Sequence, residues 1–317
     1  MKILSRMMHV PLLFLLVYIT PSCATLDQVD MEHVAAKLLR MLEMRFCYIS
    51  FVTVSPDDDE YLIKQKKSNC FRKIVSVVRD AITAHIAKKF GIAHQVRIAH
   101  EVRIIPAGKD FPGKPRADWP ATIHTIAPGK MIKAQNTSYT RMNIKQAKIG
   151  FRRDMLQWMA KHPVLLIIVA MDTFLCNHDR HRGNLFYDAK HDSFCAIDMD
   201  SAFKYNLCAL ACKNFTAMLN DRSLRLSSKE VKTLTLYKEY LEFLIDTYHP
   251  EDTIAKYNEF AQQAGFVEGS PLYTQKIALE LERNRRMIME SYEDAKKLVI
   301  IVGQLIKKGR KRLKTMM

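Results

Sequence analysis

The chain has 317 residues, 48% of them hydrophobic, and a formal net charge of +16 at pH 7. This composition excludes an intrinsically disordered chain, and the scattered spacing of the seven cysteines excludes a small disulfide scaffold. The positive charge favours acidic partners such as nucleotide phosphates or an anionic membrane. It is spread along the sequence with no recognisable nucleic-acid module beside it, so we expect no nucleic-acid partner.

Residues 1–24 have the pattern of a signal peptide. Lys2 and Arg6 precede the apolar run VPLLFLLVYIT, and PSCATL then supplies small residues for cleavage. The run is shorter than the roughly twenty residues that a membrane span requires. Lipidation of Cys23 and a buried N-terminal helix are the alternative interpretations. We expect this leader to direct export of the chain.

The next segments predict helices and strands in alternation. Residues 30–46 have apolar side chains at helical spacing, which predicts an amphipathic helix. Residues 46–54, FCYISFVTV, are rich in strand-forming residues, and a polar turn separates them from YLIKQ at 61–65, which predicts a β-hairpin. Residues 71–90 again have helical spacing, and Gly91 is a suitable helix stop.

Two further strands are expected within residues 96–108 and 121–130, separated by a loop rich in glycine and proline. Beyond Gly129 the pattern is mostly helical, with a buried helix at 162–176 and helices throughout 228–308. We therefore expect three segments: the leader 1–24, a β-rich part 25–128 with a leading helix, and a helical part 129–317.

The charged segment 177–203, NHDRHRGNLFYDAKHDSFCAIDMDSAF, directly follows the apolar helix. A solvated polar turn is one interpretation, because turns favour Asp and Asn. A zinc site is a second, although the spacing matches no common zinc pattern. Its ligands would come from the neighbouring cysteine and histidines, Cys176, His178, His181 and His191.

A phosphate-transfer site is the third interpretation and the one that we favour. The strands NLFYD and SFCAID, joined by a polar turn, predict a hairpin that brings Asn184 and Asp198 to its open end beside Asp179. Carboxylate and amide oxygens are the ligands that Mg²⁺ prefers. Phosphoryl transfer needs such a metal and a carboxylate that orients the attacking hydroxyl.

This D-x-x-x-x-N segment with its hairpin and following aspartate resembles the catalytic segment of the protein-kinase-like superfamily. DRHRGN is similar to the D-R-H-x-x-N of phosphatidylinositol 3- and 4-kinases and of HipA-like kinases. AIDMDSAF is similar to the I-D-x-G of lipid kinases and to the D-x-D of aminoglycoside phosphotransferases. The resemblance implies that Asp179 is the catalytic carboxylate and that Asn184 and Asp198 bind the metal. Arg180 and His181 would lie near the transferred phosphate or brace the loop.

The upstream half carries a weaker part of the same resemblance. Kinases of this kind hold the nucleotide phosphates with a strand lysine, which an acidic residue on the next helix holds in turn. Lys64 in YLIKQ and Asp80 in VVRDAITAHIAKKFGI match these positions, and IHTIAPG would supply the hinge between two lobes. Three departures stand against the match. Asp80 replaces the usual Glu, Asp200 replaces a glycine, and no glycine precedes Gly91, so a glycine-rich phosphate loop is missing.

The resemblance implies a two-lobed kinase-like α+β fold with a small β-rich N-lobe and a larger helical C-lobe. It implies ATP and Mg²⁺ or Mn²⁺ as cofactors, and most directly a phosphoinositide 3-/4-kinase-like lipid kinase that transfers the γ-phosphate to a hydroxyl. A HipA-like protein kinase and a pseudokinase that acts as a binding module remain alternatives. The basic segment Lys296–Lys314 predicts peripheral contact with an anionic membrane.

Export and ATP dependence restrict where such a kinase can act, because ATP is scarce outside cells. We expect a secreted, host-targeted effector, with the lumen of a secretory pathway as the alternative.

Overall fold

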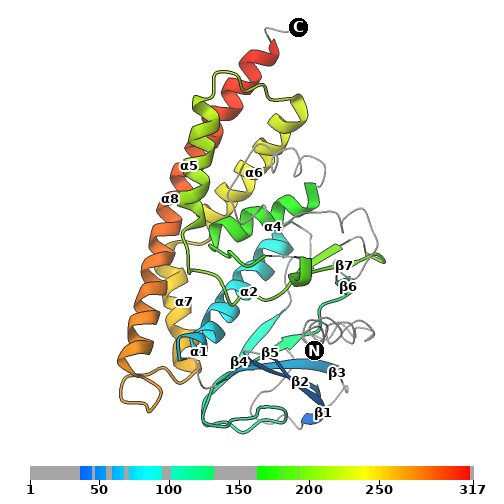
Figure 1. The fold of residues 1–317 in the computed structure, drawn as a ribbon, viewed down its shortest axis with the longest axis vertical. Coiled ribbons are helices and arrows are strands. Elements are labelled where there is room, and N and C mark those ends of the chain that lie inside the picture. The colour runs from blue at the N-terminus through cyan, green and yellow to red at the C-terminus, as the bar shows by residue number, and fades with distance from the viewer. Residues whose placement is uncertain are drawn as a thin grey trace, which may run out of the picture.

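The computed structural model describes residues 36–44, 47–54, 59–67, 71–94, 101–131, 163–180, 182–191 and 193–314. The predicted leader and His181 lie outside these residues. Within them, a β-sheet lies at one end of the molecule and helices rise from it toward the other (Figure 1). The expected α+β architecture, with a small β-rich lobe followed by a larger helical lobe, is confirmed.

The β-rich lobe is a five-stranded antiparallel sheet with the strand order β1-β2-β3-β5-β4. Its strands are β1 (Ala36–Glu43), β2 (Cys47–Val54), β3 (Asp59–Lys66), β4 (Val102–Ile105) and β5 (Ala121–Thr125). The predicted hairpin is confirmed as β2 and β3, and the two later strands are confirmed as β4 and β5. Burial alternates along β3, so that Tyr61 and Ile63 enter the sheet's own core and Lys64 lies on the opposite face.

The predicted leading helix over 30–46 is wrong where the structure describes it. Residues 36–43 form β1, which pairs with β2 and has an irregularity in its register between Leu38 and Arg40. Leu38 and Leu39, two of the apolar residues that suggested a helical face, are exposed. Pairing with the neighbouring strand overrides a local pattern that fits either structure.

A second, three-stranded antiparallel sheet lies above the first sheet and beside the helices in Figure 1. It comprises β6 (Lys130–Met131), β7 (Leu185–Asp188) and β8 (Ser193–Ala196), and a 3₁₀ turn, η6 (Arg182–Asn184), leads into β7. The hairpin predicted within the charged segment is thereby confirmed. Gly129 has φ +79°, and a Cβ there would lie 2.2 Å from the carbonyl oxygen of Tyr187. Only glycine fits this close approach between the start of β6 and β7.

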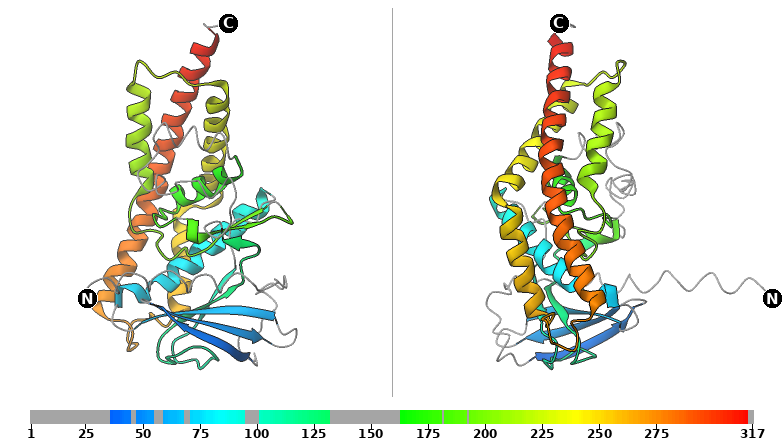
Figure 2. Two further views of the ribbon diagram at one scale, coloured as in Figure 1. Left: turned by 45° about the vertical axis from the view of Figure 1, so that its right-hand side comes forward. Right: turned by 90° about the vertical axis from the view of Figure 1, so that its left-hand side faces the viewer.

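The remaining described elements are helices. They are α1 (Phe71–Ile74), α2 (Ser76–Ala93), α4 (Pro163–Phe174), α5 (Leu207–Asn220), α6 (Ser228–Thr247), α7 (Pro250–Gln263) and α8 (Gln275–Lys314). The helices predicted at 71–90, 162–176 and 228–308 are thus confirmed within the described residues. Helix α8 runs the height of the molecule and contacts α1, α4, α5, α6 and α7 (Figure 2). None of the helices in the described part is long and apolar enough to cross a membrane.

Helix α2 connects the sheet to the helical lobe. It contacts β4 and β5 on one side, and its apolar residues share one core with α4, α6 and α8. Phe90 packs against Tyr240 and Phe243 of α6, and the hydroxyl of Tyr248 donates to the carbonyl of Ile86 at 3.1 Å. The position of α2 is therefore fixed by the helical lobe as much as by the sheet.

Candidate active site

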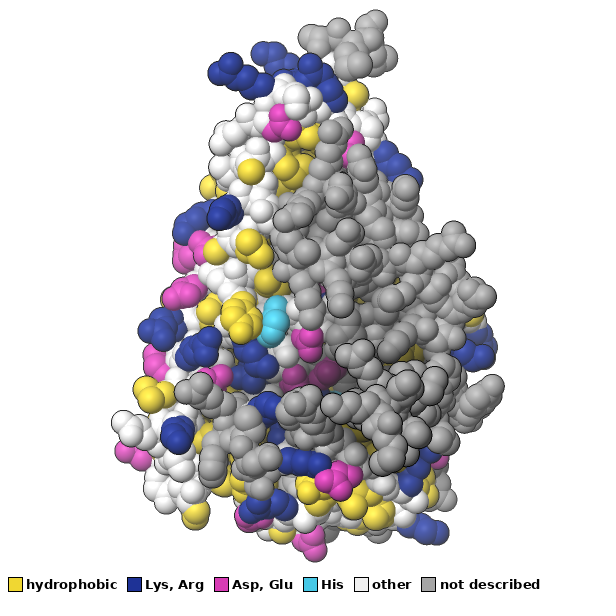
Figure 3. Space-filling view, in the orientation of Figure 1, with side chains coloured by type: hydrophobic (Ala, Val, Ile, Leu, Met, Phe, Trp, Pro, Cys, Tyr) yellow, Lys and Arg dark blue, Asp and Glu magenta, His cyan; other side chains and the backbone are white. Residues whose placement is uncertain are grey.

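Lys64 lies at the centre of a cluster of carboxylates from both lobes. Its Nζ is 2.6 Å from Oδ1 of Asp198, 3.0 Å from Oδ2 of Asp200 and 3.8 Å from Oδ2 of Asp80. The period of two along β3 directs Lys64 away from the sheet's own core and toward these acids. Figure 3 shows acidic side chains near the middle of one face of the molecule, with lysine and arginine side chains around them. The structure thus brings Lys64, Asp80 and Asp198 together.

Lys64 and Asp200 keep their charges at neutral pH. Burial lowers the pKa of Lys64, but the carboxylates of Asp198, Asp200 and Asp80 outweigh burial and hold that pKa well above its usual value. Burial likewise raises the pKa of Asp200, yet the ammonium groups of Lys64 and Lys66 hold it well below its usual range. Lys64 and Asp200 therefore form an ion pair and not a neutral hydrogen bond.

Asp80 is the most buried acid of the cluster and lies on α2. Burial raises the pKa of Asp80 to about 6, and the charge of Lys64 opposes this shift only in part. One Asp80 oxygen is 3.8 Å from Lys64, and the other accepts a hydrogen bond of 3.3 Å from the backbone N–H of Met199. Asp80 thus connects α2 both to the strand lysine and to the segment that carries Asp198.

The charged segment has an unusual backbone. The non-glycine residues with positive φ in the described part are Cys176 (54°), Asp198 (59°) and Phe203 (55°), all within or next to this segment. Each such residue costs of order 1 kcal/mol, and residues held in this way are frequent at functional sites. The strain supports a functional interpretation of the segment over a simple solvated turn.

Arg180 braces the loop that carries Asp179. The Arg180 guanidinium is buried and makes two hydrogen bonds to the carboxylate of Asp172 on α4, at 2.9 and 3.0 Å. It also donates to the carbonyls of Asn184 and Ile197, at 2.8 and 2.7 Å. These contacts correspond to the bracing role, one of the two roles that the resemblance implied for this residue. His181, the other residue in that expectation, lies outside the described residues.

Further hydrogen bonds join the segments that carry Asp179, Asn184 and Asp198. The side-chain amide of Asn184 donates to the carbonyl of Asp179 at 3.1 Å, and the backbone N–H of Ile197 donates to the carbonyl of Asn184 at 3.1 Å. Asp198 follows Ile197 directly, so the loop, η6 and the end of β8 are joined around Arg180. Asp179 is half-buried, and the side chain of Asp198 is 34% exposed.

Sequence reasoning missed three members of this arrangement. Asp172 is the buried partner of Arg180, and Lys66 forms an ion pair with Asp200 beside Lys64. Arg79 is buried next to Asp80, where its Nε donates to the backbone carbonyl of Asp200 at 2.8 Å. The sequence could have indicated Lys66, because it lies two residues after Lys64 and alternate residues of a strand share a face.

The donor set suits a hard cation and nucleotide phosphates. Mg²⁺ usually takes one or two protein oxygens and completes its octahedron with phosphates and water, and Asp198 and Asn184 carry oxygens of this kind. Among the described residues, which leave out His181 of the zinc alternative, no three His, Cys, Asp or Glu side chains group as a metal site. The described cysteines are free thiols.

Comparison with known proteins adds little to this geometry. No protein-family model matches the chain, and no curated protein does so. Among solved structures the chain is similar to a Helicobacter pylori proinflammatory kinase, CtkA, with a TM-score of 0.47 and 12% sequence identity, over 87% of this chain and 96% of that one. A similarity with this TM-score shows no function for this chain.

Proposed function

We propose that the protein is an ATP-dependent phosphotransferase that uses Mg²⁺ or Mn²⁺. The observation that carries the proposal is the convergence of Lys64 from β3, Asp80 from α2 and Asp198 from the end of β8 at one point. A surface lysine and a solvated helix acid would have no reason to meet at a buried position across two lobes. Ionised groups are buried only where partners or ligands compensate them.

Under this proposal each residue of the site has a role. Asp198 and Asn184 hold the metal, and Lys64 binds phosphate oxygens while Asp80 holds the lysine in place. Asp179 orients the acceptor hydroxyl and accepts its proton. Arg180 is a positioning residue, because it fixes the loop without an evident route to substrate. Bound nucleotide and metal supply the transferred phosphoryl group and the positive charge that stabilises it.

Binding requires Lys64 to change partners. Lys64 contacts Asp198 at 2.6 Å and Asp80 only at 3.8 Å. A cation bound to Asp198 competes with this ion pair, and the released ammonium can turn to phosphate oxygens while it stays beside Asp80. After this exchange Asp80 can hold Lys64 in place, although its side chain is shorter than that of the usual Glu.

Thermal-shift titration with ATP and Mg²⁺ tests the proposal. Wild-type protein is expected to be stabilised, by about 2.7 kcal/mol at a nucleotide concentration one hundred times Kd. Asp198→Asn should lose the metal-dependent part of this shift, because the amide is neutral and binds Mg²⁺ poorly. Asp188→Asn on the same hairpin is the matched control and should respond like wild type, since Asp188 pairs with His191. A wild-type protein that never responds to ATP would support the pseudokinase alternative.

For the acceptor, we favour a phosphoinositide-type lipid over a protein. The DRH sequence and the basic net charge support an anionic headgroup, and the HipA-like protein kinase remains the alternative. Incubation with labelled ATP and either phosphatidylinositol vesicles or cell lysate separates the two. Label found only in protein would exclude the lipid preference.

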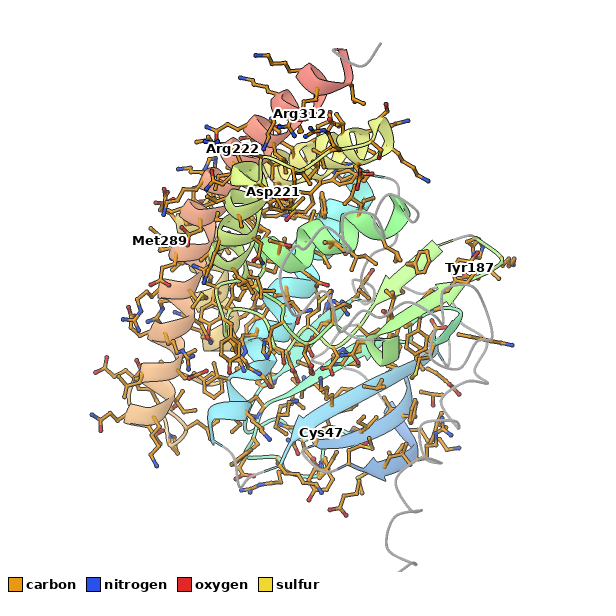
Figure 4. The ribbon with its side chains drawn as sticks, turned by 45° about the horizontal axis from the view of Figure 1, so that its top comes forward. Cys47, Tyr187, Asp221, Arg222, Met289 and Arg312 are labelled. Carbon is orange, nitrogen blue, oxygen red and sulfur yellow. The ribbon has the colours of Figure 1, made fainter. Side chains whose placement is uncertain are left out.

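Peripheral membrane contact is proposed for the end of α8. Within Lys296–Lys314, Lys308 donates to the carbonyls of Leu219 and Asp221 at 2.6 and 2.7 Å, and Arg312 donates to the carbonyl of Arg222 at 2.9 Å. These two residues cap the end of α5, and Figure 4 shows Asp221, Arg222 and Arg312 side by side. Lys307, Arg310 and Lys311 are exposed in the same stretch of α8 and remain for anionic lipid. Vesicle sedimentation with these three changed to Gln should show weaker binding.

For location, we propose a secreted, host-targeted effector, with a secretory-pathway lumen as the alternative. The leader pattern supports export, and the requirement for ATP supports delivery into another cell. Mass spectrometry of the mature N-terminus tests the first half. A mature protein that retains Met1 and fractionates with the cytosol of the producing cell would contradict it.

A further inference from the structure

Two lysines of β3 converge on one carboxylate oxygen. Lys64 and Lys66 lie on the same face of the strand, and the Nζ atoms of both contact Oδ2 of Asp200, from Lys64 at 3.0 Å. Both lysine side chains are only 12% exposed, so neither ammonium is simply solvated. Lys64 has two further acids in contact, Asp80 and Asp198. Lys66 therefore brings a second positive charge into the site.

The positive charges of three lysines act on the carboxylate of Asp200. Besides Lys64 and Lys66, the charge of Lys204 acts on it, and Lys204 hydrogen-bonds the neighbouring Ser201 at 3.2 Å. The backbone carbonyl of Asp200 also accepts from Arg79. Carboxylate and phosphate oxygens attract the same donors. An anionic ligand group that replaced the carboxylate of Asp200 would therefore contact the same ammonium groups.

The sequence provides a reason for a second cation here. No glycine precedes Gly91, so the first three strands offer no glycine-rich loop whose backbone could approach phosphates closely. The connection between β1 and β2 spans only residues 44–46. Phosphate charge that backbone amides would otherwise neutralise must be met by side chains.

We propose that Lys66 is a second phosphate-binding residue, which contacts Asp200 in the nucleotide-free protein and exchanges it for a phosphate oxygen of the bound nucleotide. The inference rests on the proposed function, since it assumes that the site takes a nucleotide triphosphate. In this arrangement Asp200 is a displaceable counter-ion that keeps two like-charged lysines together until the ligand arrives. No bond is made or broken, and the exchange is one of ion pairs.

Lys67 provides a matched control for Lys66. It is the next residue in the chain, and it points elsewhere, with an ion pair of 2.5 Å to Glu43 and its ammonium 5.1 Å from the centroid of the Tyr48 ring. A Lys→Met change at either position removes one charge and keeps a long side chain. Only the change at 66 should reach the ligand.

The experiment measures calorimetric Kd values for ATP, with Mg²⁺ and with EDTA, and for adenosine, which has no phosphates. Lys66→Met is expected to weaken ATP binding about tenfold with and without metal, and to leave adenosine binding unchanged. Lys67→Met should match wild type for both ligands. Lys66→Arg keeps the charge, so it should recover most of the lost affinity and show that the site still folds.

Asp200→Asn separates a phosphate-binding role from a structural one. If Asp200 competes with phosphate for Lys66, this variant should bind ATP more tightly than wild type in EDTA. If the ion pair only holds the site together, Asp200→Asn should weaken ATP binding as Lys66→Met does, and the inference would be wrong. If wild type binds ATP and Lys66→Met binds it with the same Kd, the inference about Lys66 is wrong, while the proposed function stands. A wild-type protein that binds no ATP would overturn the proposed function and the inference with it.

Discussion

Asp80 occupies an unusual position for an ionised residue, because it is buried on α2 and only loosely paired. Its distance to Lys64 is 3.8 Å, whereas the more exposed Asp198 lies at 2.6 Å from the same ammonium. Burial therefore dominates, and the pKa of Asp80 rises to about 6. In the unfolded chain an aspartate has a pKa near 3.9, which is approximately two units lower.

Replacing Asp80 should change how stability depends on pH. Between the unfolded and folded pKa values the native state binds the extra proton, so the contribution of Asp80 to stability is present at low pH and is lost as pH rises through about 6. Asp80→Asn removes this loss of stability, because the amide does not ionise. The melting temperature of Asp80→Asn minus that of wild type should thus increase from pH 4 to pH 7, in metal-free buffer.

Asp118→Asn is the control for this pH profile. Asp118 is exposed, and the hydrogen bond from Arg116 lowers its pKa below the usual value, so its contribution is lost only at lower pH. The difference between Asp118→Asn and wild type should stay nearly constant from pH 4 to pH 7. A flat profile for Asp80→Asn would show that Asp80 is ionised throughout this range and closely paired with Lys64.

At the scale of elements, the sequence predicts contiguous patterns well and fails where distant strands decide the outcome. The hairpin of β7 and β8 and the helix α2 have strong local signals, and both form where they are expected. β1 has a local pattern that fits a helix, and its pairing with β2 makes it a strand. The same limit applies to the site. Asp179, Asn184 and Asp198 lie in one short segment that a motif can reveal. Asp172 lies outside that segment and joins it through a tertiary contact with Arg180, which no local motif reveals.

Gly129 makes the pairing of β6 with β7 possible, and we predict that Gly129→Ala disrupts it. A Cβ at this position would lie 2.2 Å from the carbonyl oxygen of Tyr187 and 2.6 Å from Cα of Asp188, both backbone atoms that cannot rotate away. The loss should exceed the roughly 1–2 kcal/mol that positive φ alone costs an alanine. Since β7 follows η6 and Asn184, the response to ATP should weaken as well. Urea denaturation and thermal-shift titration measure the two effects.

Gly108→Ala isolates the conformational part of this effect. Gly108 has φ +82°, close to that of Gly129, but no atom lies within 4 Å of its hypothetical Cβ. Gly108→Ala should lose only the conformational part of the free energy of unfolding, and its response to ATP should stay unchanged. Equal losses for the two variants would mean that β6 can move away from β7 at little cost.

At the scale of the whole molecule, the two lobes are joined by a shared core and by a helix that reaches both ends. α8 has 40 residues, which corresponds to a length of about 60 Å. Near its start, Glu280 pairs with the buried Arg79 at 3.2 Å, next to Asp80 on α2. The apolar residues of α2 meanwhile belong to the core of the helical lobe. The site is therefore built on a helix that cannot shift without disturbing both lobes.

This continuity predicts that the lobes unfold together. Wild-type protein should show one cooperative transition in urea, with the same midpoint by far-ultraviolet circular dichroism and by tryptophan fluorescence, because Trp119 shares the core of the helical lobe. Phe90→Ala removes a fully buried ring that packs on Tyr240 and Phe243, and it should cost about 3–5 kcal/mol. Ile92→Ala, two residues further along α2 and 69% exposed, should change stability by no more than about 0.5 kcal/mol. Two separate transitions in wild type, or a small effect of Phe90→Ala, would show that α2 belongs to the sheet alone and that the lobes are independent.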